Sequence, residues 1–159
     1  MSDKDINIRD YLHEIISSFK EISKKEFVFN FDQDSNPKKI SKSIEIVYGL
    51  RNFIGNANKF AKNSIFINLK SDSEFTELTV EDDGNGYPRD ILSKIGEPYL
   101  KSNYSKDKSK EGLGLGLFIG KTLLEKNFAS VNCRNSKTRS GAEVIIRSVS
   151  YTHLTLPTT

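Results

Sequence analysis

Seven of the ten glycines in this chain lie between Gly84 and Gly120. Glycine has no Cβ atom, so it lets the backbone adopt unusual conformations and approach a ligand closely. Most of these glycines fall in two clusters, residues 82–86 (DDGNG) and residues 112–116 (GLGLG). Because this freedom is concentrated in one part of the sequence, we expect the ligand to bind there.

The apolar residues predict regular elements on both sides of the glycine clusters. Five segments alternate apolar and polar residues as strands do: residues 27–31, 64–69, 75–82, 129–134 and 142–148. Three segments have the three- and four-residue spacing of amphipathic helices: residues 6–22, 42–61 and 113–127. The second and third strands are separated by a polar turn, so a hairpin is expected. Helices and strands should therefore pack as two layers of an α/β domain.

Length and composition limit the class of protein. A chain of 159 residues with 36% hydrophobic and 28% charged residues is typical of a single soluble domain with one core. No apolar run approaches the roughly 18 residues that cross a bilayer. The first residues carry acids where a signal peptide would be basic. The net charge of +3 comes from 24 basic and 21 acidic residues, a balance too even to predict a nucleic-acid partner.

The ends of the chain and its single cysteine add two expectations. Cys133 lies in a predicted strand and has no second cysteine to pair with, so a packing role is favoured over a reactive thiol. Residues 151–159 contain four threonines and no periodicity. We therefore expect one domain over residues 1–149 and a disordered or non-native tail over residues 150–159.

Three polar residues, Asn52, Asn56 and Lys59, stack on one face of the helix predicted over residues 42–61. Mg²⁺ prefers oxygen ligands and usually takes only one or two from a protein, while nucleotide phosphates and water complete its shell. The amide oxygen of Asn56 fits this requirement. Taken alone, the three residues could also form a solvated helix face, and residues 82–86 an ordinary Asp-Gly turn.

The order and spacing of three motifs, residues 52–60, 82–86 and 112–116, resemble the ATP-binding catalytic domain of bacterial sensor histidine kinases. These kinases belong to the superfamily that also holds gyrase, the Hsp90 chaperones and the mismatch-repair ATPases. The resemblance covers roughly residues 5–148, and residues 96–129 look most like redox-responsive sensor kinases of proteobacteria. It implies a mixed sheet with helices on one face, and ATP held between the second long helix and a mobile lid at about residues 97–112.

The resemblance also implies roles for individual residues toward ATP and Mg²⁺. Asn56 would bind the metal, Lys59 a phosphate, and Phe60 would lie against the adenine. Asp82 would accept a hydrogen bond from the adenine amino group. The second glycine cluster would meet the phosphates with backbone N–H groups where a helix opens. The further residues expected to contact the nucleotide are Gly84, Gly86, Tyr99, Lys101, Gly112, Leu113, Gly114, Leu115 and Gly116.

Asn52 bears on the type of reaction. ATPases of the superfamily carry glutamate there as the base that activates water, and an amide cannot take that proton. This favours transfer of the γ-phosphoryl group to a histidine over hydrolysis, with Asn52 and Lys59 as the catalytic candidates. Three alternatives remain: an anti-sigma-factor-like serine kinase, a nucleotide-dependent module that binds a partner, and an ATP-inert structural protein.

The phosphoacceptor histidine of such a kinase is expected on another domain. His13 is followed by EIIS, which lacks the family's continuation, and it is interpreted as a helix-surface residue. The resemblance therefore implies two partners: a histidine-bearing dimerisation domain and the receiver domain of a response regulator. The parent protein is expected to be a membrane-anchored homodimer whose catalytic domain lies in the cytoplasm.

Overall fold

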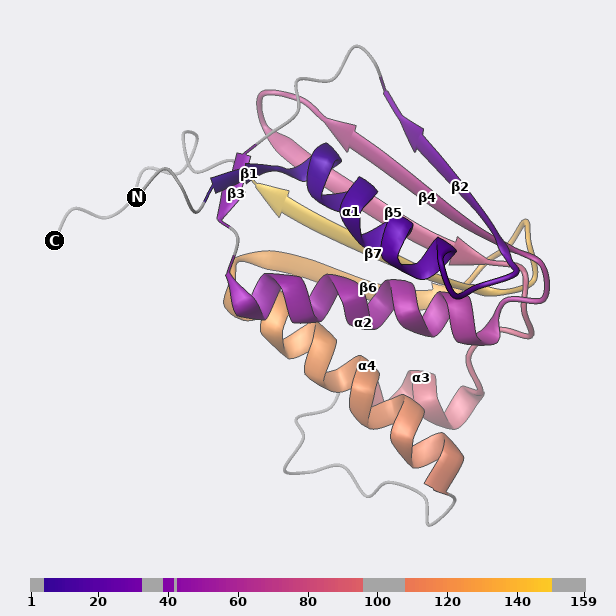
Figure 1. Ribbon diagram of the computed structural model, residues 1–159. Helices are drawn as coiled ribbons and strands as arrows, with labels where there is room; N and C mark the ends of the chain where they lie inside the picture. Colours follow the sequence, from indigo (N-terminus) through magenta and orange to yellow (C-terminus); the bar gives the residue numbers. More distant parts are fainter. Residues whose placement is uncertain (1–4, 33–38, 42, 96–107, 150–159) are drawn as a thin grey trace, which may run out of the picture.

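The structure is a computed structural model that describes residues 5–32, 39–41, 43–95 and 108–149. Its centre is a five-stranded mixed sheet with the order β2-β4-β5-β7-β6 (Figure 1). The strands are β2 (Glu26–Phe31), β4 (Ser64–Ser71), β5 (Phe75–Asp82), β6 (Ala129–Asn135) and β7 (Ala142–Val149). Strand β2 runs parallel to β4, and the other neighbours are antiparallel.

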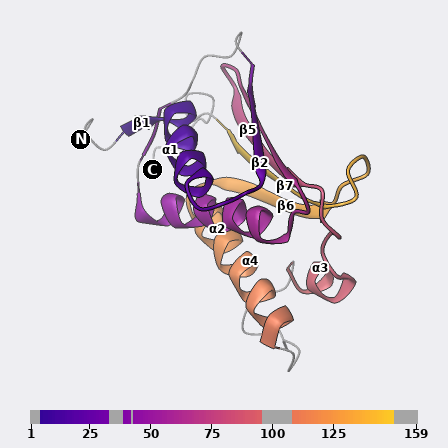
Figure 2. The same ribbon diagram turned by 45° about the vertical axis from the view of Figure 1, so that its right-hand side comes forward.

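Helices lie over one face of this sheet. They are α1 (Ile8–Lys20), α2 (Ile44–Phe60), α3 (Arg89–Ile95) and α4 (Lys108–Lys126). Figure 2 shows α4 running away from the sheet beneath α2, with α3 near its lower end. Two short strands, β1 (Asp5–Asn7) and β3 (Lys39–Ser41), pair separately ahead of α1 and α2. Within the described residues, no helix is both long and apolar enough to span a membrane.

The core forms between the helices and the sheet because the strands alternate apolar residues on one face. In β4 these are Ile65, Ile67 and Leu69, all at most 1% exposed. Register pairs Ile67 with Val80, and Val80 with Val144, so the apolar rows of neighbouring strands coincide. The helix residues buried against them include Leu12, Ile15, Leu50, Phe53 and Ile54.

Polar residues fix where the two long helices begin. The Asn7 side chain accepts hydrogen bonds from the amides of Arg9 and Asp10 at the start of α1. Ser43 accepts one from the amide of Ile46 at the start of α2, at 3.1 Å. Such N-caps satisfy amides that have no partner inside the helix.

Glycines allow α4 to pack closely on α2. A Cβ atom at Gly49 would lie 2.8 Å from Cγ of Leu124, and one at Gly120 would lie 3.1 Å from Cε2 of Phe53. A Cβ at Gly116 would lie 3.4 Å from Oδ1 of Asn52. The missing side chains therefore bring α4 alongside the polar face of α2.

The expected α/β fold with a mixed sheet and helices on one face is confirmed, as is the hairpin of β4 and β5. Helix α4 corrects one prediction, because it begins at Lys108 and not at Leu113, so residues 108–112 of the expected lid are helical. The rest of the lid and the tail at 150–159 lie outside the described residues. Helix α3 and the strands β1 and β3 were not predicted, since three to seven residues carry too little periodicity.

Candidate functional site

A pocket of about 320 Å³ opens between the C-terminal half of α2 and the ends of β5 and β7. From α2 it is lined by Phe53, Asn56, Ala57, Lys59 and Phe60. From the sheet and the segment after β5 it is lined by Val80, Asp82, Asn85, Gly86, Tyr87, Pro88, Ala142 and Val144. Asp82 and Asn56, which are far apart in the sequence, thus share one cavity.

Asp82 is the buried acid of this pocket, with 2% of its surface exposed. Its Oδ1 accepts hydrogen bonds from the amide of Gly84 at 2.8 Å and from that of Ala142 at 3.3 Å. Gly141 makes this arrangement possible, because a Cβ there would overlap the backbone and carboxylate of Asp82. Among the described residues no donor reaches Oδ2, so this oxygen is left to accept a hydrogen bond from a ligand.

The environment of Asp82 changes its acidity. Burial raises the pKa of its carboxyl group above the ordinary value, the amides of Gly84 and Ala142 oppose this rise, and the neighbouring acids Asp83 and Glu81 add to it. A buried carboxylate with one oxygen that accepts no hydrogen bond is stabilised in its ionised form by a ligand that donates an N–H group to that oxygen.

The segment after β5 is held in an unusual backbone conformation. Gly86 has φ of +83°, which favours glycine, and a Cβ there would lie 2.7 Å from Oδ1 of Asn135. The Asn135 side chain accepts a hydrogen bond from the amide of Tyr87 at 2.6 Å and donates one to its carbonyl at 3.2 Å. Asn135 therefore binds Tyr87 as a neighbouring strand would, and this holds Gly86 and Tyr87 in the pocket wall.

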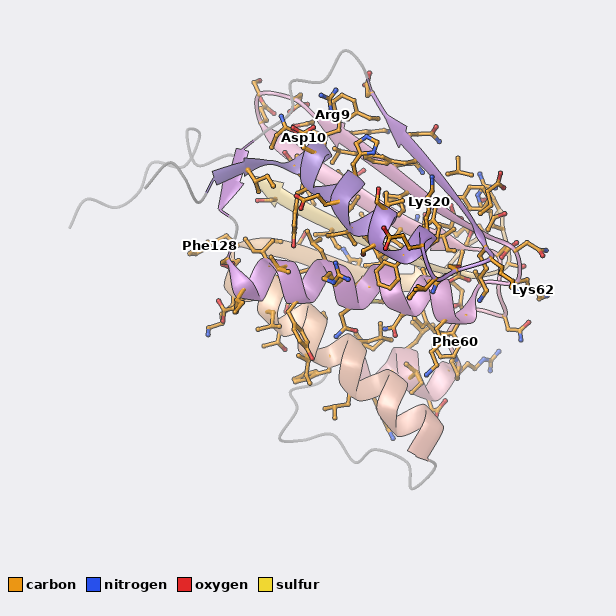
Figure 3. All side chains as sticks on the ribbon, viewed as in Figure 1. Arg9, Asp10, Lys20, Phe60, Lys62 and Phe128 are labelled. Atoms are coloured by element: carbon orange, nitrogen blue, oxygen red, sulfur yellow. The ribbon has the colours of Figure 1, made fainter. Side chains whose placement is uncertain are left out.

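The opposite wall carries polar groups of α2. The amide nitrogen of Asn56 donates to Oδ1 of Asn52 at 3.4 Å, which leaves the Asn56 oxygen as an acceptor. Lys59 is exposed, its ammonium lies 5.4 Å from the centroid of the Phe60 ring, and it forms no ion pair with any carboxylate among the described residues. Phe60 is 43% exposed at the end of α2 (Figure 3).

These side chains fit the two ends of a nucleotide with a metal ion. A single amide oxygen, that of Asn56, suits Mg²⁺ when phosphates and water supply the other ligands. Lys59, a cation with no acidic partner in the part of the chain that the structure describes, suits a phosphate group. Asp82, buried beside glycine backbone and the apolar Val80, suits the amino edge of a flat base.

The second glycine cluster is arranged differently from the expectation. Gly112, Leu113, Gly114, Leu115 and Gly116 lie inside α4, where each N–H bonds the carbonyl four residues earlier. Only the first four amides of α4, those of residues 108–111, have no partner within the helix. Gly114, Leu115 and Gly116 are not among the described residues that line the pocket. Tyr99 and Lys101 lie outside the described residues.

Gly84 orients Asp82 without lining the pocket itself. Its backbone lies against the end of α2, where a Cβ would overlap the carbonyl of Phe60. Its amide binds Asp82, so it orients the carboxylate and is not itself among the lining residues.

Several lining residues were not identified from the sequence. Tyr87 directly follows the first glycine cluster and is 8% exposed. Val80 and Val144 could have been found, because they lie on the same face of paired strands as Asp82. Asn135, which holds Tyr87 and is not itself a lining residue, carried no signal, since its role depends on a contact across 48 residues.

Cys133 lies behind Tyr87 on β6. Burial raises the pKa of its thiol to about 11, which a hydrogen bond with Tyr87 only partly opposes. Burial also raises the pKa of Tyr87 well above its ordinary value. Both groups therefore stay protonated at neutral pH, as expected for a packing role.

Residues 41–152 match the family described as histidine kinase-, DNA gyrase B-, and HSP90-like ATPase. Over 97 residues, 58% of the chain, the sequence is 37% identical to the sensor histidine kinase RegB of Cereibacter sphaeroides, of which it covers 21%. It is 30% identical over 100 residues, 62% of the chain, to the sensor protein SrrB of Staphylococcus aureus, of which it covers 17%. The chain thus matches about a fifth of the length of these relatives.

Solved structures share the fold. The catalytic domain of the histidine kinase ThkA superposes with a TM-score of 0.72 at 21% identity, over 91% of this chain and 95% of that one. Full-length ShkA, in complex with AMPPNP, superposes with a TM-score of 0.70 at 20% identity, over 90% of this chain and 30% of that one.

Proposed function

Because this chain belongs to the family of histidine kinase-, DNA gyrase B- and HSP90-like ATPases, we propose that it binds Mg·ATP and transfers the γ-phosphoryl group to a histidine. The histidine would be carried by a separate dimerisation domain within a two-component signalling system. The relatives RegB and SrrB, both named as sensor proteins, support this placement.

The observation that carries the proposal is the pocket shared by Asp82 and Asn56. The carboxylate of Asp82 would accept a hydrogen bond from the adenine amino group, while Tyr87 and Val80 provide apolar surface for the ring. On the other wall the Asn56 oxygen would hold Mg²⁺, and Lys59 would reach a phosphate. The two ends of one nucleotide would therefore be held by elements that the fold brings together.

The residues around the phosphates suit transfer better than hydrolysis. Bound Mg²⁺ would neutralise charge that develops on the transferred phosphoryl group. Asn52 lies beside Asn56 and binds its amide, and an amide cannot act as a base toward water. Transfer would then depend on positioning of the acceptor histidine in line with the γ-phosphate.

Two partners follow from this reaction. One is the dimerisation domain that presents the acceptor histidine, and the other is the receiver domain that accepts the phosphoryl group next. Both are proposed for the whole protein and its pathway, because this chain matches only about a fifth of the length of RegB and SrrB. We place the domain in the cytoplasm, attached to a membrane-anchored homodimer.

The test is a transfer assay with the whole chain. The protein is mixed with Mg·ATP labelled at the γ position and a candidate histidine-bearing dimerisation domain. We expect label on the partner that is lost in acid and retained in base, as phosphohistidine is. The matched controls are the Asn56→Ala chain, which should not label, and the partner with its histidine replaced by glutamine.

Two results would overturn the proposal. Acid-stable label on serine would identify a serine kinase. If the wild-type chain fails to bind ATP by calorimetry, with and without Mg²⁺, it is not a nucleotide-dependent enzyme.

A further inference from the structure

The turn between α2 and β4 is held at both of its ends by charged side chains from other parts of the chain. On the first side, Lys25 reaches from the loop between α1 and β2 to the last turn of α2. Its ammonium donates to the carbonyl oxygen of Asn58 and to that of Lys59, the latter at 3.2 Å. Ser23 adds a hydrogen bond to Oδ1 of Asn58 at 2.6 Å.

A cation is well placed at this position. The last carbonyls of a helix have no partner within it, and they carry the negative end of the helix dipole. Lys25 satisfies two of them with one charged group. Lys25 therefore fixes the backbone from which the Lys59 side chain extends.

On the second side, Asp83 binds the amides that follow α2. Its Oδ1 accepts hydrogen bonds from the amides of Lys62 at 2.8 Å, Asn63 at 3.0 Å and Ser64 at 3.2 Å. Its Oδ2 accepts a longer one from Asn63 at 3.3 Å. Desolvation acts against ionisation, but these amides outweigh it and leave the pKa of Asp83 below its ordinary value. Asp83 is therefore a carboxylate whose acceptors are occupied by the turn.

The two contacts enclose residues that line the pocket. Lys59 and Phe60 both line the pocket; Lys25 binds the carbonyl of Lys59 itself, and Asp83 binds the amides that begin two residues after Phe60. Asp83 directly follows Asp82, and Gly84 lies against the carbonyl of Phe60. The end of α2 is thus attached to the strand end that carries Asp82.

We propose that Lys25 and Asp83 are positioning residues, which hold the phosphate-binding end of α2 at a fixed place relative to the base-binding Asp82. Neither side chain lines the pocket, so both act through the turn. The inference rests on the proposed function, because it assigns the roles of Lys59 and Asn56 to phosphate and metal.

This role predicts a selective effect on ligands. If either side chain is removed, the end of α2 gains freedom, and the geometry of Lys59 and Asn56 toward the phosphates suffers. Small misplacements of positioned groups are costly. Asp82 keeps its own bonds to Gly84 and Ala142, so recognition of the base should persist. ATP affinity should fall while adenosine affinity stays nearly constant.

The experiment compares two removal variants with two conservative ones in the whole chain. Lys25→Met keeps the aliphatic stem without the charge, and Lys25→Arg keeps donors for the carbonyls. Asp83→Ala removes the acceptors, and Asp83→Asn keeps Oδ1 for the three amides. Lys24→Met is the matched control, because Lys24 is the exposed neighbour of Lys25. Affinities for Mg·ATP and for adenosine are measured by calorimetry and by competition.

We expect Lys25→Met and Asp83→Ala to weaken Mg·ATP binding by about tenfold, with adenosine changed by less than about twofold. Lys25→Arg and Asp83→Asn should recover most of the loss, and Lys24→Met should bind as the wild type does. If Asp83→Ala does not fold, the Mg·ATP affinities of Lys25→Met and Lys25→Arg still test the positioning role.

Each other outcome contradicts the inference in a recognisable way. Equal loss for ATP and adenosine would mean that the two side chains only stabilise the fold. Wild-type affinity for ATP in Lys25→Met would mean that the Lys25 ammonium is not needed to position the turn between α2 and β4 for phosphate binding. Failure of the wild-type chain itself to bind ATP would reject the proposed function instead.

Discussion

The two ends of the proposed nucleotide site differ in how they are built. At the base end, Asp82, Gly84, Gly86 and Tyr87 are each held by hydrogen bonds or close backbone contacts that leave little freedom. At the phosphate end, the second glycine cluster lies within α4, and its amides are bonded inside the helix. The proposed base-binding end is therefore preformed, whereas amide contacts to phosphate would require α4 to begin later than Lys108.

The glycines of α4 lower the free-energy cost of opening its first turns. Each glycine in a helix interior costs about 1 kcal/mol relative to alanine, and α4 has three in the five residues from Gly112 to Gly116. The glycines of α4 therefore lower the cost of opening the start of this helix, whereas Gly84 and Gly86 are held by close contacts with Phe60 and Asn135.

The largest expected effect comes from the base end. Asp82→Asn should weaken ATP binding by about tenfold to a hundredfold, because its oxygen stays with the amides of Gly84 and Ala142 and the NH2 group in place of Oδ2 cannot accept the charge-assisted hydrogen bond from the adenine amino group. Calorimetric titration with Mg·ATP measures this. Unchanged affinity would show that the preformed end does not bind the base.

The melting temperature and the pH dependence of ATP affinity distinguish a lost contact with the base from misfolding of Asp82→Asn. The pKa of Asp82 is raised in the folded state, so the folded chain binds more protons than the unfolded chain between the two pKa values. The free energy of unfolding therefore falls as pH rises through that window, and Asp82→Asn removes this cost. The variant should melt at the wild-type temperature or above at pH 7. ATP affinity of the wild type should fall as pH drops through the raised pKa of Asp82, and this step should vanish in the variant.

A smaller effect is expected at the phosphate end. Gly116→Ala should stabilise α4 in its observed form, since the new Cβ would lie at an acceptable 3.4 Å from Oδ1 of Asn52. If the helix has to open to offer its amides, a gain of about 1 kcal/mol in helix stability should weaken ATP binding about fivefold. Adenosine affinity should not change. Calorimetry with both ligands measures the difference.

Thr122→Ala is the matched control for Gly116→Ala. Thr122 is exposed on the same helix but beyond the glycine cluster, and alanine there also raises helix propensity. Thermal melting should show that both variants are stabilised, and only Gly116→Ala should lose ATP affinity. An equal loss in both, or a gain in Gly116→Ala, would remove the distinction between the two ends.

The sequence predicted the preformed end better than the other. Asp82 was identified because it ends an alternating strand just before glycines, and the structure places it in one pocket with Asn56. The start of α4 was not predicted, because Lys, Ser and Glu suit a polar loop and an exposed helix equally. Asn135, Lys25 and Asp83 were missed for a different reason. Their hydrogen bonds link residues 19 to 48 positions apart in the sequence, and no local pattern specifies such contacts.

The smallest expected effect is at Cys133, which lies behind the base end. Its thiol has a pKa of about 11 and is mostly buried, so at pH 8 it should react with iodoacetamide at least about a hundredfold more slowly than a free cysteine. Cys133→Ala should change ATP affinity by less than about twofold, because Asn135 holds the Tyr87 backbone without help from the thiol. Fast alkylation, or a loss of ATP affinity as large as that of Asp82→Asn, would mean that Tyr87 is held from its side chain. The base end would then be no more preformed than the glycine cluster of α4.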